Sequence, residues 1–124
     1  MKKHLTVIIP TYNRAEILQK CLKALAGQTY PASGFEIVVV DDGSSDRTRE
    51  VSVSFINEGV VDAKYLRQEN KGPAAARNLG IRTAAGEVIL FIGDDIIAAP
   101  DLLERHASWH LKNTDFGAAL LGHV

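Results

Sequence analysis

The sequence is poor in the features that mark specialised classes of protein. It contains one cysteine, Cys21, so an intrachain disulfide is excluded and a secreted disulfide scaffold is not expected. Cys21 lies on an apolar helical stripe, which predicts a core residue. No apolar stretch approaches the roughly 18 residues of a membrane span. The short apolar run near the start ends at Pro10, so we expect no signal peptide.

A charge of one sign is also lacking. The 124 residues include 14 Lys and Arg and 15 Asp and Glu, which leaves a net charge of -1. This balance creates no field that would attract nucleic acid or anionic lipid. We therefore expect no nucleic-acid partner, and membrane association only through parts outside this chain. The apolar fraction of 46% is ordinary for a globular protein and too high for disorder.

Short apolar runs alternate with amphipathic stretches along the chain. Most runs are continuous rather than alternating, which is typical of parallel strands covered on both faces. The run at 63–67 is weaker and predicts a strand near an edge. Strands are predicted at residues 5–9, 35–40, 63–67, 88–92 and 118–124.

Helices are predicted between these strands, and their first residues can be recognised. Asn13 and Glu16 form a capping-box pattern ahead of the first helix. Ser45 can cap the second helix, and Pro73 suits the first turn of the third. A fourth helix is predicted over residues 101–112, because acidic residues lie near its start and a Lys near its end, as the helix dipole favours. The alternation of strands and helices predicts an α/β fold with a mostly parallel sheet.

Polar, turn-forming clusters follow three of the predicted strands, at residues 10–14, 41–46 and 93–95. Ligands of open α/β sheets bind beyond the carboxyl ends of the strands, so the clusters should converge on one edge. Adjacent carboxylates there would repel unless a cation or a donor relieves them. Mg²⁺ and Mn²⁺ bind carboxylates together with substrate phosphates. We therefore predict a site for a metal ion and a diphosphate; the alternative is a set of ordinary turns and caps.

A second candidate cluster lies at the start of the third predicted helix. Gly72 before a helix start offers free backbone N–H groups to an anion. Arg77, one turn later, can reach a phosphate or pair with an acidic residue, although a solvated helix face is the alternative. Neither Gly-x-Gly-x-x-Gly nor Gly-x-x-x-x-Gly-Lys-Ser/Thr is present, which disfavours a plain dinucleotide dehydrogenase and a P-loop enzyme.

Four segments, taken in order, resemble family 2 glycosyltransferases, which are inverting enzymes of the GT-A fold. The segments are residues 7–14 (VIIPTYNR), 36–46 (EIVVVDDGSSD), 70–78 (NKGPAAARN) and 93–95 (GDD). The resemblance implies a Rossmann-like, mostly parallel sheet flanked by helices. Family members carry their acceptor-binding half and catalytic base after the metal motif. Residues 1–124 are therefore expected to be a truncated, donor-binding part, with the base beyond Val124.

The resemblance also implies roles for individual residues. The implied nucleotide-binding residues are Pro10, Thr11, Tyr12, Arg14, Asp42, Arg77 and Asp94. Asp42 matches the acid that hydrogen-bonds the base. Arg77 matches a helix arginine near the nucleotide and is expected to face Asp42 and Asp94. Asp95 matches the metal-binding position. Gly93 replaces an Asp of many members, so Mg²⁺ or Mn²⁺ is expected to bind measurably only with the nucleotide.

The implied reaction transfers a sugar from a nucleoside-diphosphate sugar to a hydroxyl of a glycan, a lipid or another acceptor. The metal would neutralise charge on the leaving diphosphate. We expect a cytoplasmic location, or a peripheral one at the inner membrane face. Two alternatives stay open: a non-catalytic nucleotide-sugar-binding module, and a nucleotidyltransferase. Residues 10–14 contain no glycine, whereas nucleotidyltransferases of the related fold open with a glycine-rich, basic loop.

Overall fold

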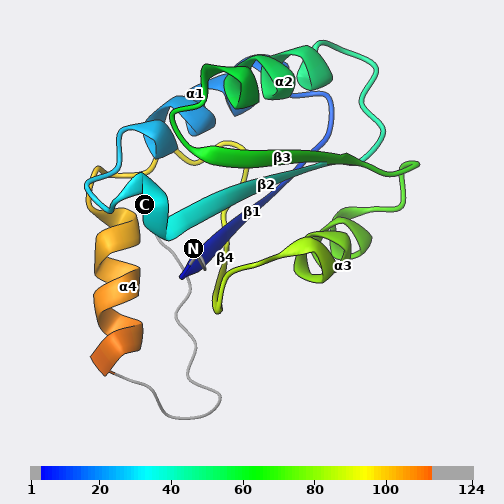
Figure 1. Cartoon of the computed structure of the whole chain (residues 1–124). Coiled ribbons are helices and arrows are strands. Elements are labelled where there is room, and N and C mark those ends of the chain that lie inside the picture. Colours follow the sequence, from blue (N-terminus) through cyan, green and yellow to red (C-terminus); the bar gives the residue numbers. More distant parts are fainter. Residues whose placement is uncertain (1–3, 113–124) are drawn as a thin grey trace.

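The computed structural model describes residues 4–112 of the chain. Its centre is a four-stranded sheet with the strand order β3-β2-β1-β4 (Figure 1). The strands are β1 (Leu5–Thr11), β2 (Phe35–Asp41), β3 (Asp62–Arg67) and β4 (Val88–Phe91). The helices are α1 (Ala15–Ala26), α2 (Thr48–Glu58), α3 (Pro73–Thr83) and α4 (Leu102–Lys112), and a short 3-10 turn, η1 (Ala32–Gly34), precedes β2.

The predicted α/β fold with a parallel sheet is confirmed. The pairings of β1 with β2, of β1 with β4 and of β2 with β3 are all parallel. The strand predicted near an edge is β3, which lies at one edge of the described sheet. The strand predicted at 118–124 lies outside the described residues. None of the described helices is long and apolar enough to span a membrane.

The core lies on both faces of the two central strands. Val7 and Ile9 of β1 pack among apolar residues of α1, α2 and α4, whereas Ile8 packs with Ala76 of α3. Figure 1 accordingly shows α3 on the opposite side of the sheet from α1 and α2. Every residue of β2 is buried. This two-sided burial is why the sequences of β1 and β2 are mostly apolar, with Thr6 and Glu36 as buried polar exceptions inside the two strands.

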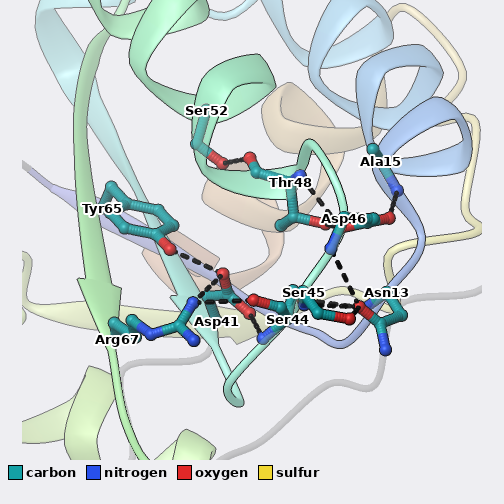
Figure 2. A network of polar contacts seen from close by, with 10 residues as sticks. All are labelled: Asn13, Ala15, Asp41, Ser44, Ser45, Asp46, Thr48, Ser52, Tyr65 and Arg67. Carbon is teal, nitrogen blue, oxygen red and sulfur yellow. Dashed lines mark hydrogen bonds and ion pairs between the residues drawn. The ribbon is translucent and has the colours of Figure 1, made fainter.

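The caps of α1 and α2 differ from the prediction. Asn13 makes no side-chain cap of α1; the first helical N–H group, that of Ala15, donates to Asp46 Oδ2 at 3.1 Å. Ser45 does not cap α2, because Asp46 Oδ1 also accepts from the N–H of Thr48 at 3.0 Å. The loops after β1 and β2 lie side by side, so one carboxylate serves both helices (Figure 2).

Candidate functional site

A cavity of about 400 Å³ lies where the carboxyl ends of β1 and β2 approach the first turns of α3. Its lining residues are Pro10, Thr11, Tyr12, Arg14, Asp42, Pro73, Ala76 and Asp94. All the residues predicted to bind the nucleotide lie on this lining except Arg77. The polar clusters at the strand ends therefore meet at one edge of the sheet, as parallel strands require.

Asp94 forms one corner of the cavity, a few residues after β4 ends. The residue is 8% exposed, and its Oδ2 accepts a hydrogen bond from Thr11 Oγ1 at 2.9 Å. The guanidinium of Arg14 lies 3.3 Å from Asp94 Oδ1 and balances its charge. Arg14 is half-exposed, and a guanidinium has five donors, so it can bind an anion while it holds Asp94.

Asp42 lies on the facing wall, at the start of the loop after β2. Its Oδ1 accepts hydrogen bonds from Gln68 Nε2 at 2.8 Å and from the N–H of Lys71 at 2.6 Å, and the N–H of Gly72 lies 3.1 Å from its Oδ2. Burial alone would raise the pKa of Asp42, but these hydrogen bonds outweigh it and hold the pKa below its ordinary value. The charged carboxylate therefore orders the loop that leads into α3.

Two expectations about the loop before α3 and about α3 itself need correction. The N–H groups of Lys71 and Gly72 are not free for an anion, because they donate to Asp42. Arg77 is exposed and does not line the cavity, and within residues 4–112 it forms no ion pair with Asp42 or Asp94. The reason is that Ala76 is the residue of α3 that packs against Ile8 and lines the cavity, so the next residue, Arg77, lies about 100° further round the helix and is exposed.

The acidic motif after β4 forms a turn rather than an extended segment. Asp94 is buried and Asp95 is exposed, so the two carboxylates have different surroundings. A Cβ at Gly93 would lie 3.0 Å from Asp95 Oδ1, so the Asp95 carboxylate turns back over the glycine. Cys21 is buried beneath this turn, as predicted, with its Sγ 3.8 Å from the carbonyl oxygen of Gly93. Burial, together with Asp94 and Asp95, raises the pKa of Cys21 to about 12.

Few carboxylates are available to hold a metal ion near the cavity. Among the described residues, no group of three or more His, Cys, Asp and Glu side chains is placed to hold a metal ion. Asp95 offers an exposed carboxylate, whereas the oxygens of Asp94 accept from Thr11 and Arg14. Such a donor set fits a divalent ion that takes its remaining ligands from substrate phosphates.

A buried network behind the cavity was not predicted. Asp41 ends β2, is fully buried and accepts a hydrogen bond from Tyr65 Oη at 2.5 Å (Figure 2). Arg67 NH1 lies 3.5 Å from the same carboxylate and donates to the carbonyl oxygen of Ser44 at 2.9 Å. Burial, and then the bond to Asp41, raise the pKa of Tyr65. Gln68 was also missed, although its place directly after β3 marks the same edge of the sheet.

Comparisons with known proteins agree on one family. The family model described as Glycosyl transferase family 2 matches residues 6–120. Glycosyltransferase AglE of Haloferax volcanii is 42% identical over 103 residues, which cover 83% of this chain and 34% of that protein. The crystal structure of Staphylococcus aureus TarS 1–349 in complex with UDP-GlcNAc is similar, with a TM-score of 0.83 and 31% identity over 90% of this chain and 32% of that one.

A third similar protein is a mannosyltransferase from Pyrobaculum calidifontis, solved in complex with GDP-Man and Mn²⁺. Its TM-score is 0.82 at 30% identity, over 89% of this chain and 33% of that one. The chain therefore spans about a third of the length of each of these three proteins. The likeness covers about nine tenths of the chain, so the GT-A fold implied by the sequence motifs is confirmed.

Proposed function

Because the chain belongs to glycosyltransferase family 2, we propose that residues 4–112 form the donor-binding part of an inverting glycosyltransferase. In the reaction, the oxygen of an acceptor hydroxyl bonds to the anomeric carbon of the donor sugar. The bond from that carbon to the nucleoside diphosphate breaks on the opposite side, and the hydroxyl proton leaves to a base. The observation that carries the proposal is the cavity at the carboxyl ends of β1 and β2, because its lining includes six of the seven residues that the sequence resemblance predicts to bind the nucleotide.

The side chains around the cavity divide into a wall for the base and a wall for the phosphates. Tyr12 is 46% exposed and offers a ring face against which a nucleobase can lie. Asp42 bounds the same space, and the hydrogen bond from Gln68 holds its carboxylate in place. Arg14 supplies a positive charge next to Asp94, where the diphosphate can approach. The solved structures similar to this chain contain UDP-GlcNAc and GDP-Man, which supports a nucleoside-diphosphate sugar as the donor.

A divalent metal, Mn²⁺ or Mg²⁺, fits the exposed carboxylate of Asp95. When bound, such an ion neutralises the charge that develops on the departing diphosphate. The chain's own contribution is the placement of Asp95 beside the cavity residue Asp94. The similar mannosyltransferase from Pyrobaculum calidifontis was solved with Mn²⁺, which supports this choice of ion. Paramagnetic relaxation should detect Mn²⁺ binding with UDP present and little without it; tight binding to the free protein would contradict this.

The test is nucleotide release by the full-length protein, with the acceptor-binding half and catalytic base that the sequence resemblance implies; residues 1–124 alone are expected to bind the donor without transferring the sugar. The protein is incubated with UDP-GlcNAc or GDP-mannose, Mn²⁺ and a panel of glycan and lipid acceptors, and free UDP or GDP is measured. We expect release that depends on an acceptor, and a product whose anomeric configuration is opposite to that of the donor. Asp95→Asn should slow release without unfolding the protein. Donor binding without any release would identify a binding module, and release of pyrophosphate from a nucleoside triphosphate would identify a nucleotidyltransferase.

A further inference from the structure

The loop after β1 is tied to the loop after β2 by the side chain of Asn13. Its Oδ1 accepts hydrogen bonds from the N–H groups of Ser45 at 2.8 Å and Asp46 at 3.3 Å (Figure 2). The N–H of Asn13 in turn donates to Ser44 Oγ at 2.7 Å. One amide side chain thus satisfies two backbone donors of a loop that lies about 30 residues further along the chain.

Asp46 ties the loops together in the opposite direction. Its Oδ2 accepts from the N–H of Ala15 at 3.1 Å, and its Oδ1 accepts from the N–H and the hydroxyl of Thr48. Burial alone would raise the pKa of Asp46, but its hydrogen bonds outweigh this effect and lower the pKa. We call the hydrogen bonds between residues 13–15 and 44–46 the cross-loop bracket.

The backbone of Asn13 restricts which residues can occupy this place. Its φ is 51°, in the left-handed region that Asn, Asp and Gly tolerate best. The side chain must also present an acceptor oxygen to two N–H groups. Asn and Asp satisfy both requirements, whereas Gly satisfies the first alone. These three residues therefore separate the effect of the side chain from the effect of backbone strain.

The bracket joins two loops that both contribute to the lining of the cavity. Asn13 stands between Tyr12 and Arg14, which line the cavity, and the loop that it holds begins with Asp42, which also lines it. The N–H of Asp42 also donates to the carbonyl oxygen of Thr11 at 2.9 Å, so the two loops remain paired beyond the strands. Asn13 is exposed and outside the apolar core, so the packing of α1 and α2 does not depend on it.

We propose that Asn13 is a positioning residue for donor binding: through the cross-loop bracket it sets the separation between Tyr12 and Arg14 on one side and Asp42 on the other. This inference rests on the proposed function for the identity of the ligand. Asn13 is not among the residues that line the cavity. Its loss lets the loop of residues 41–46 move, and the Asp42 carboxylate moves with it, away from the N–H groups of Lys71 and Gly72 that it holds.

The test compares Asn13→Gly, which removes the acceptor and keeps the backbone relaxed, with Asn13→Asp, which retains the acceptor. Gln28→Ala is a matched control, since Gln28 is also an amide that bridges two segments. Gln28 donates to the carbonyl oxygens of Ala24 at 3.2 Å and Ala99 at 2.8 Å and accepts from the N–H of Leu103 at 3.0 Å. It therefore reports on the loss of an equivalent bridge at the far end of α1.

Two measurements on the full chain decide the proposal. UDP affinity by calorimetry should fall about tenfold in Asn13→Gly, the factor expected when one or two neutral hydrogen bonds stop supporting the bound geometry. It should stay near the wild-type value in Asn13→Asp and Gln28→Ala. Amide hydrogen exchange without ligand should accelerate in Asn13→Gly at Lys71 and Gly72, which Asn13 does not contact. A merely structural role would loosen Ser45 and Asp46 alone.

Unchanged protection of Lys71 and Gly72 in Asn13→Gly would overturn the proposal, as would an equal loss of UDP affinity in Gln28→Ala. The exchange measurement requires no ligand. Hence, if the wild-type chain binds no nucleoside diphosphate, the proposed function fails, while the protection of Lys71 and Gly72 still decides whether Asn13 positions Asp42.

Discussion

Replacing Asp42 by Ala should destabilise the protein as well as weaken nucleotide binding. The substitution takes the acceptor from Gln68 Nε2 and from the N–H groups of Lys71 and Gly72. A hydrogen bond to a charged group contributes about 1.5–3 kcal/mol. Lys71 is exposed, and Gln68 and Gly72 are half-buried, so water replaces much of what is lost. We expect a net loss of about 2–3 kcal/mol, the value of a single such bond.

Urea unfolding of the full chain measures this loss. With a urea m-value of about 2 kcal/mol/M, the midpoint should fall by about 1–1.5 M. Asp42→Asn retains one acceptor oxygen and should lose only about 1 kcal/mol. A midpoint for Asp42→Ala within about 0.2 M of wild type would refute the claim that Asp42 orders the loop before α3.

The acid dependence of stability provides a second measure of the same carboxylate. The pKa of Asp42 is lower in the folded protein than its ordinary value of 3.8. Its stabilisation is therefore complete above that ordinary value and is lost as the pH falls through the lower, folded pKa. Asp42→Ala should lose less stability than wild type over this acidic range. Parallel pH profiles for the two proteins would contradict the assignment.

Three further predictions concern parts of the fold away from the cavity. Gly80→Ala would place a Cβ 2.6 Å from Ile8 Cγ2 in the core. The free energy of unfolding measured in urea should therefore fall by about 1–3 kcal/mol, although Ala has the higher helix propensity; a rise in this free energy would contradict the prediction. Because its pKa is about 12, Cys21 should react with a thiol reagent at pH 8 only when the protein unfolds. Reaction of the folded protein as quickly as a free thiol would contradict this. Burial alone would raise the pKa of Glu36, but its hydrogen bonds and the charge of Lys64 outweigh this effect and hold the pKa below its ordinary value of 4.5. Glu36→Gln should therefore lose less stability than wild type as the pH falls below 4.5, and an unchanged acid profile would contradict this.

The central strands and the place of the site were predictable from the sequence. β1 and β2 are covered on both faces, and such burial produces continuous apolar runs that can be recognised without a structure. The end of each run is marked by a polar residue, which is Thr11 for β1 and Asp41 for β2. Because parallel strands end at the same edge, these residues and Asp94 could be placed together before any coordinates were known.

The partners of individual side chains were not predictable in the same way. Asn13 and Ser45 have good local capping patterns, yet the carboxylate that serves both helices is that of Asp46. Local pattern cannot show this, because the choice depends on which loops lie next to each other. The position of Arg77 had a similar cause, because it depends on which face of α3 packs against the sheet, and that face is the one with Ala76.

The most direct test of the donor-site assignment is a crystal structure of the full chain with UDP and Mn²⁺. UDP should lie in the cavity, with its base between Tyr12 and Asp42 and its diphosphate directed towards Arg14 and Asp95. A second, open hollow lies on the outer side of the same loops, bounded by Asn13, Glu16 and Arg47 among others. UDP bound in that hollow, with the cavity at the strand ends empty, would contradict the account.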